Sequence, residues 1–560
     1  MRQIYELMPE NVTTGWSNYP RPQFVRDSFY NLNGIWKVSG QEVLVPFCLQ
    51  SAKSGFAGKV PEKITYEKHF RLPEDFAKNQ VFLHFGAVDQ IAEVTMNGIY
   101  LGRHEGGYLP FSFDVTDAIN LVGENVLCVD VTDSLSHLYP YGKQKKRRGG
   151  MWYTPVSGIW QSVWMESVSE NYVKGVKVTP DLKGINLKVD TEAAEYRVTI
   201  SCDYNDYIYE NTFENKGKAF RIDIDDPQLW TCEQPTLYTM RIQTHSDEIK
   251  TYFALRTVTI ENVNGVNRIC LNNYPIFLNG VLDQGYYCDG IFTPSNEEEY
   301  TRDILRMKHL GYNILRKHIK IEPEYFYYQC DKLGMLVLQD MVNNGHYSFF
   351  WDTVMPTFCS KKASDTLRIR SWKRKKIFVS HMKDTVKHLY NHPCIVGYTI
   401  FNEGWGQFDS DRIYDAVKKL DETRFIDSTS GWFKQKKSDV DSEHVYFKNI
   451  ELKPEERPML LSECGGFQYT VKGHVFSNRI YGYGGCGSGE EVLTKISEMY
   501  EQMVIPAMNQ GLCGCIYTQL SDVEDEVNGL YTYDRKACKI DAAKMRELNQ
   551  NLAKIYEKSI

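Results

Sequence analysis

The sequence lacks long apolar runs and an excess of positive charge. No window approaches the roughly 18 uninterrupted apolar residues that a membrane-spanning helix requires, and the first residues, MRQIYELMPENVTTGW, contain no signal-peptide core. We therefore expect a cytoplasmic protein with no membrane partner. The 65 Lys and Arg residues are outnumbered by 72 Asp and Glu, which gives a net charge of -7, so charge gives no reason to expect a nucleic-acid partner.

Paired cysteine motifs are also absent. The 14 cysteines contain no C-x-x-C spacing that would indicate a zinc site, and most lie in apolar segments, where we expect them reduced and buried. The one C-x-C, Cys513 and Cys515, is a weak metal signal because two thiolates alone make a poor site. The basic cluster KQKKRR at 143–148 lies between glycines, and we expect it to form a solvated loop.

The chain changes its pattern twice along its 560 residues. Short alternating runs separated by Gly, Asn and Asp, from about Leu32 to Val168, are typical of an antiparallel sandwich. Shorter strand-like runs up to about Leu255 indicate a second, smaller sandwich, and strands then alternate with helical patterns. The predicted domains are residues 1–168, 169–257 and 258–560.

The third region has the strand count of a closed barrel. Eight strand-like segments are recognised, most of them separated by helical patterns: IFLNGV, NILRKH, LVLQDM, IVGYTIFNE, RFIDSTSG, HVYF, MLLSECG and GCIYTQLSD. This count predicts a (β/α)8 TIM barrel, whose active site lies at the C-terminal ends of the strands. The residues that end these segments are polar: Asp283, Arg316, His318, Asp340, Asn402, Glu403, Trp432, His444, Tyr446, Glu463 and Asp522.

Two of these residues are carboxylates in matching positions. Glu403 ends the fourth segment and Glu463 ends the seventh, so we expect them to face each other across the barrel mouth. Such a pair suits glycosidic cleavage, in which one group donates a proton and the other attacks the anomeric carbon. Spacing alone does not distinguish it from a metal-binding pair, but neighbouring Asn, Trp, Tyr and Arg favour a sugar over a metal.

The motifs FNEGWGQFD, LLSECGG and MNGIYLGRHEGGYLPFSFDVT, in this order of domains, resemble glycoside hydrolase family 2, which includes β-galactosidases, β-glucuronidases and β-mannosidases. The resemblance covers almost the whole chain. It implies a jelly-roll-like sugar-binding sandwich, an immunoglobulin-like sandwich and a catalytic TIM barrel. It also implies an exo-acting retaining glycosidase without a cofactor, with Glu403 as acid/base and Glu463 as nucleophile.

Other site residues follow from the same resemblance. Asn402 matches the residue that bonds the sugar 2-hydroxyl. Tyr446 matches the tyrosine that orients the nucleophile, although a core tyrosine is the alternative, and Arg316 matches an arginine that holds the nucleophile, with a structural ion pair as the alternative. The further candidates for sugar contacts are Trp432, Asp340, Asp283, Tyr517 and His318. The family's usual histidine position holds Ile319, so His318 can equally be a packed histidine.

Two departures from the family concern the metal and the glycone. QDMVNNGH, after the third strand, lacks the Glu-x-His that supplies magnesium ligands in the large β-galactosidases and keeps only His346, so we expect no obligatory metal. β-Glucuronidases carry Asn-x-Lys before a glycine that matches Gly529, whereas this chain has Glu526, Val527 and Asn528. Asp522, Glu524 and Glu526 would repel a uronate if they faced it.

We therefore expect neutral glycosides as substrates, galactosides first. A β-glucuronidase, which would need another cation such as Lys317 or Lys320, a β-mannosidase and an α-L-arabinopyranosidase are the alternatives. Transglycosylation and a non-catalytic carbohydrate-binding protein also stay open. The sandwich loop 148–161 carries Trp152 and Tyr153, which look exposed and either cover the sugar pocket or pack between domains. The sequence is compatible with a homo-oligomer.

Overall fold

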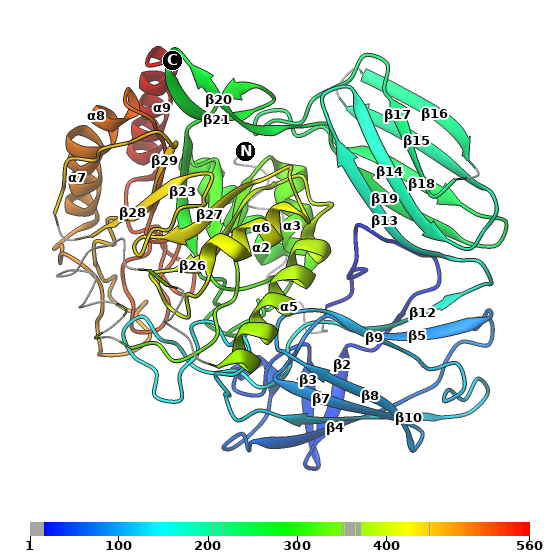
Figure 1. The fold of residues 1–560 in the computed structure, drawn as a ribbon. Coiled ribbons are helices and arrows are strands. Elements are labelled where there is room, and N and C mark those ends of the chain that lie inside the picture. Colours follow the sequence, from blue (N-terminus) through cyan, green and yellow to red (C-terminus); the bar gives the residue numbers. More distant parts are fainter. Residues whose placement is uncertain are drawn as a thin grey trace.

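The computed structural model describes residues 16–204, 207–215, 217–348, 350, 352, 364–365, 371–446 and 448–560. The first 15 residues, on which the expectation about a signal peptide rests, therefore lie outside the described part. Two β-sandwiches lie on one side of a barrel of strands and helices (Figure 1). None of the helices in the described residues is long and apolar enough to span a membrane.

The first sandwich consists of two antiparallel sheets. The four-stranded sheet contains, in order, β1 (Tyr30–Asn31), β12 (Val163–Val168), β5 (Gln80–Phe85) and β9 (Phe111–Asp114). The six-stranded sheet contains β3 (Gln41–Val45), β2 (Gly34–Val38), β4 (Lys63–Phe70), β10 (Asn125–Thr132), β7 (Ile91–Met96) and β8 (Ile99–Glu105). A short pair, β6 (Val88–Asp89) and β11 (Gly158–Ile159), and the 3-10 turn η1 (Ala52–Ser54) complete it.

Local sequence explains these strands. In β10 the residues alternate between buried and more accessible positions, so one face of the strand packs into the core of the sandwich. The run AEVTMNGIYLG, one segment by its pattern, is a hairpin of β7 and β8 that turns at Asn97 and Gly98. Both turn residues have positive φ, 51° and 81°, as a tight Asn-Gly hairpin turn requires.

The second sandwich is smaller, as the pattern predicts. One sheet contains β13 (Val173–Pro180), β14 (Gly184–Thr191) and β17 (Ala219–Asp223). The other contains β16 (Tyr207–Asn215), β15 (Tyr196–Tyr204), β18 (Tyr238–Gln243) and β19 (Glu248–Phe253). Strand β14 alternates between buried and exposed residues, which is the pattern of a sheet with one face against a core.

The predicted third domain begins with an antiparallel sheet that the pattern did not indicate. It contains β20 (Val258–Val263), β21 (Val266–Leu271) and β22 (Tyr274–Pro275). Arg268 of β21 is buried and donates to the carbonyl of Met508, 2.7 Å away, near the start of the last barrel strand. The sheet therefore packs at the end of the barrel opposite the strand C-termini.

The barrel contains all eight predicted strands, in the order β27-β26-β25-β24-β23-β30-β29-β28. They are β23 (Leu278–Asp283), β24 (Ile314–Lys317), β25 (Leu336–Asp340), β26 (Ile395–Asn402), β27 (Phe425–Ser430), β28 (Asp441–Val445), β29 (Met459–Cys464) and β30 (Leu512–Tyr517). Neighbouring strands in this order are parallel. Their C-terminal ends consequently lie at one mouth.

Helices surround the barrel where the described chain connects its strands (Figure 1). They are α2 (Glu298–His309), α3 (Glu324–Leu333), α5 (Trp372–Leu389), α6 (Ser410–Lys418), α7 (Gly489–Met499), the π-helix η3 (Tyr500–Val504), α8 (Ile505–Met508) and α9 (Ala542–Lys558). The predicted helices NEEEYTRDILRMKHLG and RIYDAVKKLD correspond to α2 and α6. Helix α5 faces the first sandwich, where its His381 contacts the ring of Tyr108.

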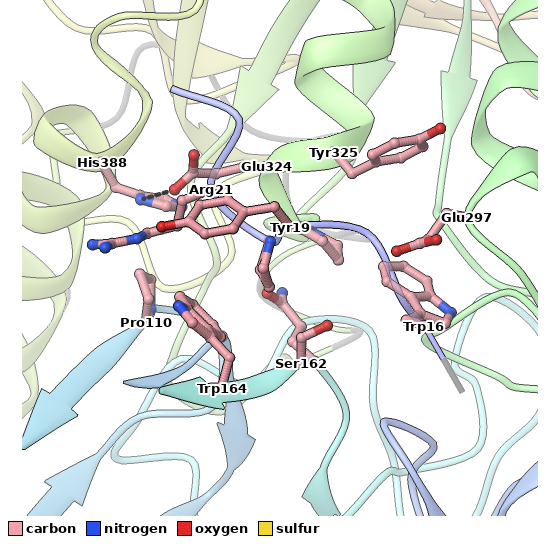
Figure 2. A pocket seen from close by; sticks show the side chains of 14 residues that line it. Trp16, Tyr19, Arg21, Pro110, Ser162, Trp164, Glu297, Glu324, Tyr325 and His388 are labelled. Atoms are coloured by element: carbon pink, nitrogen blue, oxygen red, sulfur yellow. Dashed lines mark ion pairs between the residues drawn. The ribbon is translucent and has the colours of Figure 1, made fainter. Parts of the chain in front are cut away.

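The chain start joins the first sandwich to the barrel. Trp16 donates to the carbonyl of Pro294 at 3.2 Å, and Arg21 forms an ion pair with the buried Glu166 at 2.6 Å. Figure 2 shows the pocket beside this segment, where His388 Nδ1 lies 3.7 Å from Glu324 Oε1. Its volume of about 30 Å³ is that of one water molecule in the liquid, so it is too small for a sugar.

Candidate active site

Glu403 follows directly after the last residue of β26 and has an unusual backbone conformation. Its φ of 52° lies in the left-handed region, which non-glycine residues rarely adopt and which is enriched at functional sites. Its amide donates to the carbonyl of Ser430 at 2.9 Å, and its own carbonyl accepts from Trp432 Nε1 at 2.8 Å. These two bonds to the end of β27 hold the residue at the barrel mouth.

Glu463 is the second-last residue of strand β29 and is surrounded by hydrogen-bond donors and cations. Arg316 Nη1 donates to its Oε1 at 3.0 Å, and the Tyr446 hydroxyl donates to its Oε2. Burial alone would raise the pKa of Glu463, but the charges of His444 and Arg316 outweigh it and lower this pKa to about 2. The Glu463 carboxyl is therefore ionised at neutral pH.

His444 lies between the two glutamates. Its Nδ1 is 2.9 Å from Glu403 Oε1 and 3.6 Å from Glu463 Oε2, while its Nε2 is 3.0 Å from the Ser430 hydroxyl. One oxygen of each glutamate and one nitrogen of His444 all lie within 4.8 Å of one another. The two carboxyl groups are therefore neighbours, as they are in retaining glycosidases, where they lie roughly 5 to 5.5 Å apart. Two carboxylates and an imidazole are also a donor set that a divalent cation could use.

Arg316 donates hydrogen bonds to four groups, one of which is Glu463. Besides Glu463, it donates to Asp340 Oδ1 at 3.0 Å, to Asn402 Oδ1 at 2.9 Å and to the carbonyl of Ser462 at 3.0 Å. The side chain is fully buried. Because a guanidinium has a fixed planar fork, these bonds fix both the Glu463 carboxylate and the Asn402 amide in orientation.

The remaining predicted contacts have other partners. Asp283 forms a buried ion pair with Lys317 at 2.6 Å, and His318 Nδ1 is 2.7 Å from Asp340 Oδ2. Burial lowers the pKa of His318, which favours its neutral form. Tyr517 is almost fully buried and lies against Gly465, so it packs beneath the mouth. Trp432 remains partly accessible beside His444, with ring centroids 5.6 Å apart.

The acidic segment after β30 differs from the sequence-based expectation, because most of its carboxylates are already paired. Asp522 bonds Lys539 Nζ at 2.7 Å, and Glu524 accepts from the backbone amide of Thr154 at 3.0 Å. The charge of Glu463 contributes to a raised pKa of Glu526, so Glu526 is the carboxyl of this segment on which we base the predicted repulsion of a uronate. The two alternative cations are also paired, since Lys317 and Lys320 both bond the buried Glu322.

From its charge we expected the basic loop 143–148 to be solvated, but part of it is buried. Lys143 is 9% exposed, and Gln144 is fully buried with its amide 2.8 Å from Asp89. Trp152 and Tyr153 are buried as well, which corrects the expectation that they are exposed. Trp152 packs on Trp405 of the barrel with 5.1 Å between ring centroids, and the Tyr153 hydroxyl donates to Glu526. These aromatics therefore pack between the two domains.

Sequence patterns missed two features of this site. His444 is among the strand-end residues, but its place between the glutamates depends on how β28 lies against β27 and β29. Lys143 gives no local signal, because it reaches the barrel from the first sandwich.

Three family models match the chain in the order of its domains. They are the galactose-binding domain-like model of glycosyl hydrolase 2 at residues 57–162, a glycosyl hydrolases family 2 model at 171–256 and the family 2 TIM barrel domain at 242–462. A curated relative, the β-galactosidase of Thermoanaerobacter pseudethanolicus, is 24% identical over 450 residues, which are 74% of this chain and 55% of the relative. The chain spans about half the length of that relative.

Solved structures share the fold over nearly the whole chain. The β-D-glucuronidase of Dictyoglomus thermophilum has a TM-score of 0.76 at 18% identity and covers 95% of this chain and 98% of its own. A β-galacturonidase from Eisenbergiella tayi, bound to galacturonate, has a TM-score of 0.68 at 18% identity, with 94% and 98% covered. With sandwich, middle domain and barrel each matched by its own model, the chain belongs to glycoside hydrolase family 2.

Proposed function

We propose that this protein is a retaining, exo-acting glycoside hydrolase with Glu463 as nucleophile and Glu403 as acid/base. The observation that carries the proposal is the difference between the two carboxyl groups. Glu463 is 5% exposed and bonded by Arg316, whereas Glu403 is 14% exposed and has no arginine or lysine within 4.0 Å among the described residues. A carboxylate held ionised beside one that can carry a proton is the arrangement that double displacement needs.

The reaction follows from this placement. Glu463 attacks the anomeric carbon while Glu403 gives its proton to the leaving oxygen, which yields a glycosyl ester on Glu463. Glu403, now ionised, takes a proton from water as the water displaces Glu463, and the configuration is retained overall. Arg316 and the Tyr446 hydroxyl stabilise the Glu463 carboxylate each time it is free. In this proposal the Asn402 amide, which Arg316 orients, bonds the sugar 2-hydroxyl.

For the glycone we propose a neutral β-hexoside, galactosides first. The support is that Lys317 and Lys320 are held by Glu322 and that Asn528 precedes Gly529 where β-glucuronidases carry a lysine, with the buried carboxyl of Glu526 bonded to it. A sugar carboxylate would add negative charge beside Glu463 and Glu526. The second candidate is a β-uronide, because the solved proteins of the same fold include a β-D-glucuronidase and a β-galacturonidase.

A panel of p-nitrophenyl glycosides tests the proposal. It contains the β-galactoside, β-glucoside, β-mannoside, α-arabinopyranoside and β-glucuronide. We expect a neutral glycoside to exceed the glucuronide by at least about a hundredfold in kcat/KM, which corresponds to roughly 2.7 kcal/mol. Proton NMR of the first-formed sugar should show the β-anomer for the preferred β-hexoside. A glucuronide preference overturns the glycone assignment, an inverted first product overturns the double displacement, and binding without turnover would indicate a carbohydrate-binding protein.

A further inference from the structure

Lys143 brings a cation from the first sandwich to the barrel mouth. It lies in the loop between β10 and β11, and its carbonyl accepts from the Tyr153 amide at 2.9 Å. The residue is only 9% exposed, and its ammonium nitrogen is 5.9 Å from the centroid of the Trp152 ring. Lys143 is therefore held by a loop that itself packs on the barrel.

Apart from the Trp152 ring, the ammonium group of Lys143 has no hydrogen-bond or ion-pair partner among the described residues. It donates no hydrogen bond there, and no carboxylate lies within 4.0 Å of it. Two other cations of the same loop are paired, since Lys146 lies 3.2 Å from Glu62 and Arg148 lies 2.9 Å from Asp525. An unpaired buried ammonium is costly, so its retention at this place is explained if a ligand supplies the missing acceptors.

The groups around Lys143 identify where such a ligand lies. Its positive charge acts on Glu463 and on His318 beside Asp340, where it contributes to a lowered pKa, and on Glu526, where it opposes the rise in pKa that burial causes. Lys143 consequently lies on the side of the catalytic pair formed by β24, β29 and the segment after β30. Glu403 contributes the opposite side, beside Trp432 and Ser430.

Glu526 provides an acceptor in the same place. It is buried, and it accepts from the Tyr153 hydroxyl and from Asn528 Nδ2 at 3.0 Å. Tyr153 connects the two residues, because its amide donates to the backbone carbonyl of Lys143 and its hydroxyl donates to Glu526. The backbone of Lys143 in the sandwich and the Glu526 carboxyl of the barrel are thus bonded to one tyrosine.

We propose that Lys143 and Glu526 together recognise hydroxyl groups of a neutral glycone, with Lys143 donating and Glu526 accepting. The inference rests on the proposed function and names two specificity-determining residues for it. The pair carries no net charge when both groups are ionised, so it suits hydroxyls, each of which both donates and accepts. A uronate would satisfy Lys143 but would place a further negative charge beside Glu526 and Glu463.

Deoxygenated substrates test this assignment. Lys143→Met is measured against wild type on the p-nitrophenyl glycoside that wild type prefers and on its 3-deoxy, 4-deoxy and 6-deoxy analogues. A lost hydrogen bond from a charged donor should lower kcat/KM by about 10- to 150-fold on the parent substrate. On the analogue that lacks the bonded hydroxyl, Lys143→Met and wild type should agree within about twofold.

The control is Lys145→Met. Lys145 lies on the same loop and over the same Trp152 ring at 5.4 Å, but it is exposed, so its variant should match wild type on every substrate. Glu526→Gln is the second variant and should show the same dependence on one hydroxyl. Three results would show that the inference is wrong while the proposed function stands. Lys143→Met could be impaired equally on the parent substrate and all its analogues, it could match wild type on every substrate, or it could be impaired only on a glucuronide. A wild type that hydrolyses no glycoside overturns both.

Discussion

Removing each glutamate in turn tests which of them is the nucleophile. With a pKa of about 2 for Glu463, roughly one carboxyl in 10⁴ is protonated at pH 6. Using Glu463 as the acid would therefore add about 5 kcal/mol to the barrier. Glu403, which lies beside His444 and is more accessible, must then supply the proton.

The two variants should differ in their leaving-group dependence. Glu403→Ala should lose about 10²- to 10⁴-fold in kcat/KM on alkyl glycosides, because they need a proton on the leaving oxygen. It should lose far less with 2,4-dinitrophenolate, which leaves without one. Glu463→Gly should lose turnover with every leaving group, because no glycosyl ester can form. The exposed Glu422, which precedes β27 at the far end of the barrel, provides the control variant Glu422→Ala, and it should behave as wild type.

Azide rescue assigns the faces of the sugar. In Glu463→Gly, azide takes the place of the nucleophile in a single displacement, so the glycosyl azide should have inverted configuration. In Glu403→Ala, azide takes the place of water on the glycosyl-enzyme, so the product should have retained configuration. NMR of the two azides reports both results. The opposite pairing of products would refute the assignment of roles, and equal losses of Glu403→Ala on both leaving groups would remove Glu403 from the acid role.

Two further predictions concern the metal alternative and the buried ion pairs. Activity should persist in EDTA, because the Glu-x-His ligand motif is absent after β25 and Arg316 already donates to the Glu463 carboxylate. If EDTA abolishes activity and a divalent cation restores it, a metal bound by Glu403, His444 and Glu463 would be favoured instead. Lys317→Met should reduce the free energy of unfolding by about 3 to 5 kcal/mol in urea, because it leaves the buried Asp283 without its cation and removes one of the two lysines that bond the buried Glu322. In Lys317→Met the ratio of galactoside to glucuronide rates should not change, and a changed ratio would mean that Lys317 contacts the sugar. The control Lys383→Met, at an exposed position, should alter neither the stability nor this ratio.

The domain order and the positions of the glutamates follow from local sequence. Apolar runs of strand length, spaced by helical patterns, predict eight barrel strands, and each predicted segment overlaps one. The position of a residue at the end of such a run is a local property, so Glu403 and Glu463 are identified without knowledge of any contact. The same reasoning misses the sheet of β20 to β22, because a three-stranded antiparallel sheet before a barrel has no pattern that separates it from the sandwiches.

Only the tertiary structure decides which polar side chains are available to a substrate. Asp283 ends a barrel strand as Glu463 does, yet Lys317 neutralises it, while Arg316 fixes Glu463 beside His444. The bond from Tyr153 to Glu526 joins residues 373 apart in sequence, and through it Lys143 of the sandwich reaches the barrel mouth. Periodicity depends on neighbours within a few residues, and it therefore specifies strands and their ends. Burial and ion pairing depend on distance in space, which is set only when the sandwich packs against the barrel.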